Sequence, residues 1–440
     1  MPDPPPLAPG HNPVVGHTLT FLRDPLGSLE RWGASDSPVV RIGVAGKRAC
    51  LVADPAIARE VLGGERYTKA DIVRERLGTL QGGSLVLLEG EQWRERRGLL
   101  QSGFTRERVA GAAERTSRYA TEAVESWPAD HPVRVDREMR DLSLSVLAAA
   151  LFGLDIRGEH TPIHDAADDI LGRMDMGSVS TYLPEWVPTP TNRRFRRAVD
   201  TLHDRLDETV TRRAGSDGTA GNPDLLSTML SAGLPPETVR DELVAFLFAG
   251  FDSMATALSC TLGLLAGHPD VQADVRDELD AAAGGDASDP ETLADLPLLT
   301  AVVRESLRLY PPQYVLFREP TEPVTLGGCR VDPGTIVLVA PWVFHRDPNV
   351  WSAPERFRPG RWLDDEGAVV DRGHSDAYIP YGGGPRYCLG ARLADQTLRL
   401  VVADVCQRRR LARVGALSVS AGPTLSLDGG VSVRARPLRS

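Results

Sequence analysis

Hydrophobic residues recur at helical spacing through most of this chain. Long stretches of this kind are residues 137–153, 191–213 and 236–267. Between Leu243 and Gly267, apolar residues occupy nearly the whole circumference of the third helix. Such a helix either spans a membrane or forms the core of a large domain. Asp252 in its middle, and the charged residues throughout the rest of the chain, favour a core helix and no membrane span.

Alternation typical of strands is confined to two shorter stretches. Residues 38–55 predict a β-hairpin that turns at Ala45-Gly46, followed by a short helix with Asp54 as its N-cap. Residues 323–341 predict a second β-rich segment that turns at Asp332-Pro333-Gly334. These patterns indicate a mainly α protein with small β-sheets.

Length and composition bound the architecture and the compartment. The chain has 440 residues, of which 42% are hydrophobic, and no shift of composition marks a domain boundary. We therefore expect a single domain over residues 1–440. Residues 1–20 are rich in proline and predict an extended surface segment. They contain neither a basic n-region nor an apolar h-region, which favours a cytoplasmic protein.

Charge and cysteine content argue against two classes of function. The formal net charge is −10, whereas nucleic-acid binding requires a basic surface. The five cysteines, at positions 50, 260, 329, 388 and 406, include no C-x-x-C pair, so neither a zinc site nor a dithiol redox centre is predicted.

Cys388 has a setting that the other cysteines lack. It follows the glycine run 382–384 and precedes the helical stretch 389–406, whose N-terminal amides favour a thiolate. Such a thiolate could be a nucleophile, although the local sequence places no His-Asp or His-Asn pair beside it. It could also be an inert buried thiol, or the single sulfur ligand of haem iron. A dinucleotide-binding loop fits weakly, because Pro380 interrupts the preceding strand and Tyr387 replaces the third glycine.

The core helix carries a polar turn, "AGFDS", in its middle. A buried Asp252 must be paired or hydrogen-bonded, and Ser253 can bond to the carbonyl four residues earlier. Two interpretations are open. The turn is either a polar cluster around a bound water or a groove that delivers protons to a reactive centre.

The cysteine stretch resembles the haem-binding signature of the cytochrome P450 family, F-x-x-G-x-R-x-C-x-G. Tyr381, Gly384, Arg386, Cys388 and Gly390 stand in register. Only the first position departs, with tyrosine in place of phenylalanine, and the added hydroxyl needs a hydrogen-bond partner.

Further family hallmarks occur in the expected order along the chain. "ESLR" matches E-x-x-R through Glu305 and Arg308, and "PERF" (354–357) matches the segment that carries Arg356. "WRERR" matches W-x-x-x-R through Trp93 and Arg97. "AGFDS" matches the oxygen-activation motif, with Ser253 in place of threonine.

The resemblance implies the fold and the cofactor of that family. A long central helix would cross over haem b, and the cysteine loop would lie on the proximal side with Cys388 as the iron ligand. Arg97, Trp93, Arg318 and Arg386 resemble the family's propionate partners, whose charges lower the cost of burying carboxylates.

Glu305 and Arg308 have two possible settings. On a surface they would form an i,i+3 pair worth about 0.2–0.5 kcal/mol. Their helix is apolar around them, which favours burial and therefore a third charge. The resemblance supplies Arg356 as that charge, in a structural cluster that supports the cysteine loop.

The resemblance also implies a haem-thiolate monooxygenase. Asp252 and Ser253 would deliver protons to oxygen at the haem, although serine lacks the methyl group that stiffens threonine. Positions corresponding to family substrate contacts are mostly apolar: Phe246, Ala249, Val315 and Leu316. A hydrophobic small molecule such as a terpenoid, fatty acid or macrolide would be hydroxylated or epoxidised with O₂.

Electrons would come from a ferredoxin or flavodoxin with its reductase. A basic patch of Arg94, Arg96, Arg392, Arg399 and residues 407–413 would suit such an acidic partner, unless it is an ordinary solvated arginine face. Two other functions stay open. A peroxide-dependent haem-thiolate enzyme needs no proton relay, so "AGFDS" argues against it; a non-catalytic haem sensor needs neither relay nor patch.

Overall fold

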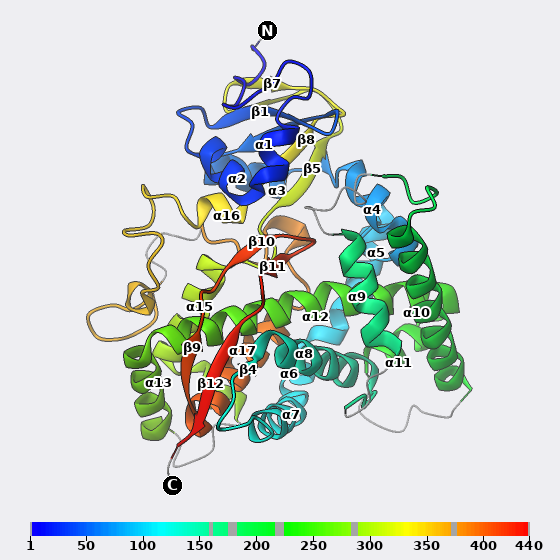
Figure 1. The fold of residues 1–440 in the computed structure, drawn as a ribbon. Helices are drawn as coiled ribbons and strands as arrows, with labels where there is room; N and C mark the ends of the chain where they lie inside the picture. Colours follow the sequence, from blue (N-terminus) through cyan, green and yellow to red (C-terminus); the bar gives the residue numbers. More distant parts are fainter. Residues whose placement is uncertain are drawn as a thin grey trace.

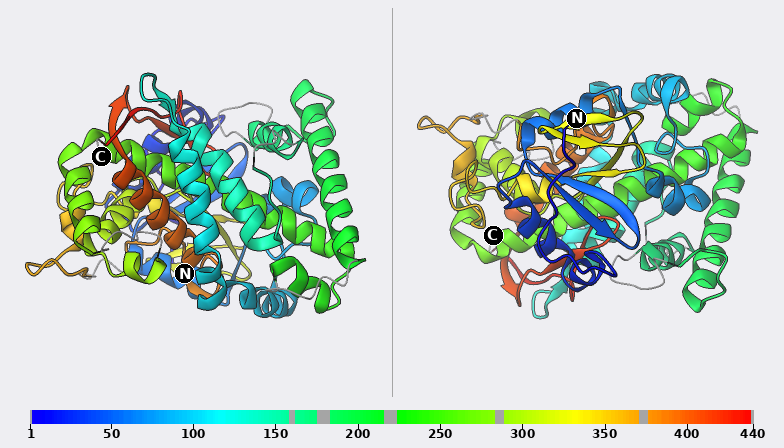
Figure 2. Two further views of the ribbon diagram at one scale, coloured as in Figure 1. Left: turned by 90° about the horizontal axis from the view of Figure 1, so that it is seen from below. Right: turned by 90° about the horizontal axis from the view of Figure 1, so that it is seen from above.

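A computed structural model describes residues 2–157, 162–174, 183–215, 224–282, 289–370 and 376–438. Figure 1 shows a β-rich part near the N-terminus, with the helices of the remaining chain beneath it. Figure 2 shows α10 along one edge of the molecule, while from above the N-terminal sheet covers the middle of the helical part. The mainly α fold with small sheets is therefore confirmed.

The helices follow the predicted periodicity. They are α1 (Thr18–Arg23), α2 (Pro25–Gly33), α3 (Pro55–Gly63), α4 (Asp71–Gln81), α5 (Gly90–Gln101), α6 (Arg106–Gly111), α7 (Ala113–Glu125), α8 (Val135–Phe152), α9 (Pro162–Met174), α10 (Pro190–Ala214), α11 (Leu225–Ser231), α12 (Pro236–Gly267), α13 (Pro269–Ala282), α14 (Pro290–Ala294), α15 (Pro297–Leu309), α16 (Pro341–Phe344) and α17 (Ala391–Arg408). Short 3₁₀ turns are η1 (Ser102–Phe104), η3 (Pro359–Trp362) and η4 (Gly384–Arg386).

The strands of the described residues form four small sheets. The largest has the order β1-β2-β8-β5-β3, a second has the order β4-β12-β9, and two hairpins pair β6 with β7 and β10 with β11. Their bounds are β1 (Val39–Val44), β2 (Lys47–Val52), β3 (Tyr67–Thr68), β4 (Val133–Arg134), β5 (Leu316–Pro320), β6 (Val324–Leu326), β7 (Cys329–Val331), β8 (Ile336–Val339), β9 (Arg409–Val414), β10 (Val419–Ala421), β11 (Leu425–Leu427) and β12 (Ser432–Pro437).

Turn and cap residues account for the N-terminal elements. Ala45 and Gly46 have φ of 50° and 75°, as a tight hairpin turn requires, and they join β1 to β2 as predicted. Asp54 accepts hydrogen bonds from the amides of Ala56 and Ile57 at 2.8 and 3.0 Å and so caps α3.

One local prediction is confirmed but incomplete, and another needs correction. Within residues 323–341 the predicted turn at 332–334 joins β7 to β8, with the amide of Thr335 donating to the carbonyl of Asp332 at 3.3 Å and Gly334 at φ of 75°. The sequence did not indicate a further turn at Gly327-Gly328, where both glycines have positive φ and join β6 to β7. The predicted extended segment 1–20 ends earlier than expected, because α1 begins at Thr18.

The long helix α12 runs through the middle of the helical part (Figure 1). Within the described residues it is the helix long and apolar enough to cross a membrane, and 72% of its most apolar window is buried inside the molecule. It packs against α8, α10, α15 and α17, and its apolar residues belong to the largest core. The prediction of a central core helix is confirmed.

Candidate haem-binding site

Backbone geometry shapes the loop that carries Cys388. Gly384 has φ of +65°, and a Cβ there would lie 2.2 Å from the carbonyl oxygen of Leu62 at the end of α3, so only glycine fits. The amide of Cys388 donates to the carbonyl of Tyr381 at 3.0 Å and closes the loop. The cysteine therefore stands three residues before α17, at the helix N-terminus that the sequence predicts.

Opposing influences act on the Cys388 thiol. The side chain is exposed, so a ligand can reach the sulfur. The protein atoms that crowd it nevertheless raise its pKa by desolvation, while the amides of Gly390 and Ala391 and the charge of Arg97 favour the thiolate. A metal ion bound to the sulfur would favour the thiolate further, because a thiol loses its proton when it coordinates a metal.

The hydroxyl that distinguishes Tyr381 from phenylalanine has a partner. It donates to Oδ1 of Asp395 on α17 at 2.6 Å. Burial raises the pKa of Tyr381 well above its usual value, so the hydroxyl stays protonated and remains the donor. This bond ties the start of the cysteine loop to the helix that follows it.

Arginine side chains connect helix α5 to the cysteine loop. The Arg97 guanidinium donates to the carbonyl of Tyr387 at 2.8 Å. The Arg386 guanidinium lies 4.5 Å from the ring centroid of Trp93, and that of Arg97 lies 5.6 Å from it. Arg386 also donates to the carbonyl of Leu88 at 3.0 Å and forms an ion pair with Glu89. Arg97, Trp93 and Arg386, predicted as one group, are therefore brought together.

Arg318 and a lysine that sequence reasoning missed complete this cluster. Burial, and then the charge of Arg386, lower the pKa of Arg318 to about 10. Burial, then Arg386 and Arg318, lower the pKa of Lys69 to about 7. In the described structure Glu89 is the carboxylate that opposes these effects. The cation cluster (Lys69, Arg97, Arg318 and Arg386) therefore carries a surplus of positive charge in a poorly solvated place.

Asp252 lies on the side of α12 that faces other polar residues. Its exposed fraction is 9%, and burial raises its pKa. Thr424, between β10 and β11, donates to its Oδ2 at 2.5 Å. Nη2 of Arg140 on α8 lies 3.8 Å from its Oδ1, and Nη1 of the same arginine lies 2.5 Å from exposed Asp168 on α9. A polar path thus joins Asp252 to the surface.

Ser253 is paired within its own helix. Its hydroxyl donates to the carbonyl of Ala249 at 2.7 Å, the bond to the fourth preceding residue that the sequence predicts. Ala249 is exposed although most of α12 is buried, so this side of the helix borders an open space. The hydroxyl can therefore serve a ligand in that space by exchanging its helix bond.

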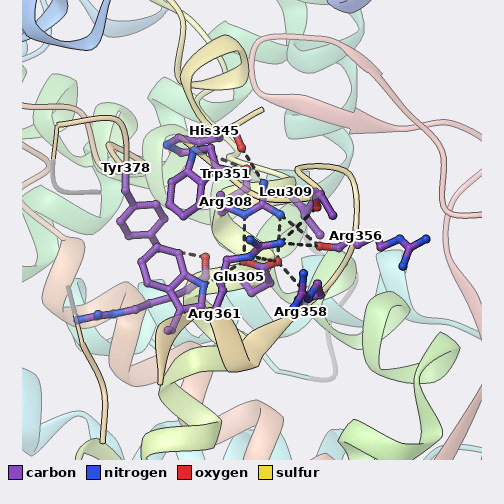
Figure 3. Close-up of polar contacts among 12 residues, drawn as sticks. Glu305, Arg308, Leu309, His345, Trp351, Arg356, Arg358, Arg361 and Tyr378 are labelled. Atoms are coloured by element: carbon purple, nitrogen blue, oxygen red, sulfur yellow. Dashed lines mark hydrogen bonds and ion pairs between the residues drawn. The ribbon is translucent and has the colours of Figure 1, made fainter. Parts of the chain in front are cut away.

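The cluster around Glu305 corrects one predicted residue. Glu305 and Arg308 are fully buried and form a two-pronged ion pair, with 2.9 Å for each hydrogen bond. The third charge is Arg361, whose Nε donates to Glu305 at 2.9 Å. Arg356 contributes only its carbonyl, at 3.4 Å from Arg308, and Figure 3 shows its side chain pointing away from Glu305.

A repeated sequence pattern explains this error. "PERF" (354–357) and "PGRW" (359–362) both have the order proline, any residue, arginine, aromatic. The second forms η3, and its Trp362 indole also donates to Glu305 at 3.0 Å. Three arginine or tryptophan side chains and the amide of Arg358 thus satisfy one buried carboxylate.

The sequence model of the cytochrome P450 family matches residues 4–413. The chain belongs to the cytochrome P450 family. It is similar to cyclooctat-9-en-7-ol 5-monooxygenase of Streptomyces melanosporofaciens, with 34% identity over 92% of this chain and 89% of that one. It is also similar to pentalenene oxygenase of Streptomyces avermitilis, with 27% identity over 92% of this chain and 90% of that one. The crystal structure of a six-coordinated cytochrome P450 from Thermus thermophilus superposes on this chain with a TM-score of 0.73 and 27% identity. The match covers 94% of this chain and 98% of that one.

Membership makes this P450 an oxidoreductase whose cofactor is haem b with a cysteine thiolate ligand. The described residues fit that group. The sulfur of Cys388 is exposed for the iron, and the surplus of positive charge in the cation cluster matches two anionic propionates. A single domain over residues 1–440 stays a prediction. The family model matches residues 4–413 as one stretch, which agrees with it.

The predicted substrate contacts of this P450 lie near the cysteine loop. The rings of Phe246 and Phe104 have centroids 5.5 Å apart, and a Cβ on Gly390 would lie 3.7 Å from Phe104. Leu316 would lie 3.5 Å from a Cβ on Gly382. Val315 is buried beside it. Phe246, through Phe104, and Leu316 therefore lie near two glycines of the cysteine loop, although they come from segments far apart in the sequence.

A hollow of about 760 Å³ lies between the N-terminal sheet, α4 and α10. Its lining is mainly apolar and includes Ile42, Phe195, Phe317, Ile336 and Leu338. The predicted contact residues do not line this hollow, although Phe317 follows Leu316 directly. Sequence reasoning missed this second apolar space, because its walls come from segments far apart in the chain.

The predicted basic patch of this P450 is smaller than expected. Arg94 and Arg392 are exposed, as are Arg410 and Arg413 of the 407–413 segment. Arg96, by contrast, forms an ion pair with buried Glu242, and Arg409 is buried and donates to the carbonyl of Val124. Arg399 is mostly covered, and its guanidinium lies 3.9 Å from Asp395.

Lys69 gives a prediction for the pH dependence of haem binding. With a pKa of about 7 it is mostly neutral at pH 8–9, and two neighbouring propionates would raise that pKa. Lys69 should therefore take up a proton when haem binds, which strengthens binding by up to about tenfold per unit as pH falls from 9 to 7. Below pH 7 the lysine is protonated in both forms and its contribution levels off.

Cys388 acts in the opposite direction, because its thiol must lose a proton on ligation. The comparison that isolates Lys69 is Lys69→Met, measured by calorimetric haem titration in two buffers of different ionisation enthalpy. At pH 8.5 we expect the variant to release about one proton more than the wild type. Equal proton release would show that Lys69 does not face the propionates.

Proposed function

We propose that this P450 is a haem-thiolate monooxygenase that inserts one oxygen atom of O₂ into a terpenoid, by hydroxylation or epoxidation. The observation that carries the proposal is the exposed Cys388 thiol on a glycine loop beside a surplus of partly buried cations. Bound haem supplies the binding and reductive activation of O₂. The protein supplies the ligand, the charge partners, the protons and the shape of the substrate space.

The site residues divide this work. Cys388 would ligate the iron, and Arg97, Arg318, Arg386 and Lys69 would hold the propionates, with Trp93 packed against Arg386. Glu305, Arg308 and Arg361 would be structural, because all three are covered and satisfy one another. They would keep the chain beneath the cysteine loop in place.

Protons would reach the site from the surface through Asp252. Asp252 pairs with the partly exposed Arg140, which also pairs with exposed Asp168, so the carboxyl lies close to solvent from which it can take a proton, and Thr424 holds its second oxygen. Burial raises the pKa of Asp252, so its carboxyl retains a proton more readily than an exposed aspartate and can pass it on. Ser253, next in the helix, would relay that proton into the open space beside Ala249.

Two observations support a terpenoid substrate: the names of the relatives and the apolar lining of the large hollow. Relatives are named for oxidation of cyclooctat-9-en-7-ol and pentalenene. The large hollow is lined mainly by aliphatic and aromatic side chains, and such walls favour a hydrocarbon skeleton through apolar burial. Phe246, Ala249, Val315 and Leu316 would contact it nearer the cysteine.

The electron donor would be a ferredoxin or flavodoxin with its reductase, in the cytoplasm. Exposed Arg94 on α5 and Arg392 on α17 lie on the two elements that flank the cysteine loop. They would attract an acidic partner to that face. The chain carries a formal net charge of −10, so this positive area would also orient the encounter.

The first test is a titration of the ferric protein with terpenes, fatty acids and macrolides, following the Soret band. We expect a spin-state shift with cyclic terpenes and weaker responses with the other classes. Turnover should then require O₂ and a ferredoxin or flavodoxin system. Product formed with peroxide but never with such a system would support a peroxide-dependent enzyme, and binding without any product would support a sensor.

A matched pair of threonines tests the proton path. Thr424 and Thr256 both bridge α12 and the β10–β11 hairpin, but Thr256 donates to the carbonyl of Leu425 and, among the described residues, forms no hydrogen bond with Asp252. We expect Asp252→Asn to lower kcat by about 10²-fold, the usual effect of removing a general acid. Thr424→Val should lower kcat by about tenfold and divert reducing equivalents to peroxide, because Asp252 loses its anchor.

Thr256→Val should leave both kcat and the amount of peroxide formed within about twofold of the wild type. Product and peroxide are measured per reducing equivalent consumed. Equal effects of the two threonine variants would mean that the hairpin contact, and not the position of Asp252, controls the reaction.

A further inference from the structure

The loop of residues 82–89 joins α4 to α5 and contacts two different parts of the molecule. On one side two adjacent carboxylates of α12 bind its amides. Gly83 donates to Oδ2 of Asp241 at 2.8 Å, and Leu85 donates to Oε1 of Glu242 at 2.9 Å. Gly82 has φ of +48°, and a Cβ there would lie 2.0 Å from Asp241, so the loop lies directly against this carboxylate.

Glu242 is an unusual residue for a helix core. It is fully buried, its Oε1 also accepts from Nη1 of Arg96 at 2.8 Å, and its Oε2 has no hydrogen-bond partner among the described residues. Burying a carboxylate with one unpaired oxygen costs free energy. Stability alone therefore does not account for a glutamate here, whereas a need to hold the loop in one position does.

On its other side the same loop binds cations through its carbonyls. Lys69 donates to Val86, Arg74 donates to Leu87 at 3.0 Å, and Arg386 donates to Leu88 at 3.0 Å. The loop ends at Glu89, which pairs with Arg386 and accepts from the amide of Lys69. Two members of the cation cluster are thus positioned by a loop that α12 holds.

We propose that Asp241 and Glu242 are positioning residues for haem: by fixing residues 82–89 they orient Lys69 and Arg386 toward the propionates. The proposal rests on the proposed function, because it takes the cation cluster as the propionate site. It adds a connection between the central helix α12 and the edge of the haem. This connection runs through the backbone of residues 82–89. Neither carboxylate needs to touch the cofactor.

The test measures transfer of haem from the intact holoprotein to excess apomyoglobin. Glu242→Ala removes the acceptor for Leu85 and Arg96, and we expect haem loss about tenfold faster than from the wild type. Glu242→Gln keeps an acceptor oxygen and should stay within about threefold. Glu237→Ala is the matched control, because Glu237 is an exposed acid in the first turn of the same helix, and its rate should not change.

A combined variant separates positioning from general destabilisation. If Glu242 acts through Lys69 and Arg386, adding Glu242→Ala to a chain that carries both Lys69→Met and Arg386→Gln should accelerate haem loss by less than about twofold. A full tenfold acceleration in that background, or wild-type haem loss by Glu242→Ala alone, would overturn the proposal.

If Glu242→Ala fails to fold, Asp241→Asn takes its place, because it weakens only the acceptor for Gly83 and the pairing with Arg240. Its haem loss should be about threefold faster, and again without further effect in the chain that carries both Lys69→Met and Arg386→Gln. Wild-type haem loss from Asp241→Asn would overturn the proposal. A wild-type protein that binds no haem would instead refute the proposed function.

Discussion

Replacing Cys388 by serine should reduce oxygen insertion by at least about 10³-fold, which corresponds to about 4 kcal/mol of transition-state stabilisation. A serine hydroxyl cannot act as the thiolate ligand that supports O–O cleavage in this family. The loop itself should persist, because its geometry depends on Gly384 and on the backbone bond from residue 388 to Tyr381. Haem would still meet the cation cluster, so loss of activity should exceed loss of haem.

The measurement combines product formation with the spectrum of the ferrous carbon monoxide complex. Cys388→Ser should lose the thiolate-type Soret band, while Cys329→Ser, the same change at a half-buried cysteine in β7, should keep it. A thiolate-type band in Cys388→Ser would mean that another cysteine ligates the iron. The assignment of the whole loop would then be wrong.

Replacing Arg361 by methionine should destabilise the protein by about 3 kcal/mol, because it removes one partner of a fully buried carboxylate. Glu305 would keep Arg308 and the Trp362 indole but lose the donor at 2.9 Å on its Oε1. Arg361 also donates to the carbonyl of Ser352 at 2.9 Å, so the variant frees the segment that wraps around α15.

Arg356→Met is the control that the structure supplies. Arg356 is exposed and its side chain points away from Glu305 (Figure 3), so its replacement should change stability by less than about 0.5 kcal/mol. Both variants are compared by urea unfolding of the holoprotein, followed by fluorescence. A larger effect from Arg356→Met than from Arg361→Met would restore the prediction made from the sequence.

Local patterns predicted those features that depend on neighbours in the chain. Helical spacing located α8, α10 and α12, and the cysteine loop could be predicted because glycines, Arg386 and the thiol lie within a few residues. The bond from Ser253 to the carbonyl of Ala249 was predictable for the same reason, since one helical turn fixes both partners.

Contacts between distant segments were not predictable in this way. The sequence predicts Arg356 as the third charge beside Glu305, because two adjacent segments share one pattern and only folding decides which of them reaches the carboxylate. It also predicts Arg96 as a surface charge, but a partner 146 residues away pairs with it. No local pattern relates Thr424 to Asp252, because 172 residues separate them.

Short runs of residues suffice to indicate the family signature, the long apolar core helix and Cys388 as the candidate ligand. The pairing of charges depends on the folded chain: the cation cluster with its surplus, Arg361 beside Glu305, and the loop held between Asp241, Glu242 and Arg386. The physical reason is that electrostatic partners are chosen by distance in space, and a chain folded around α12 brings together residues that no local pattern relates.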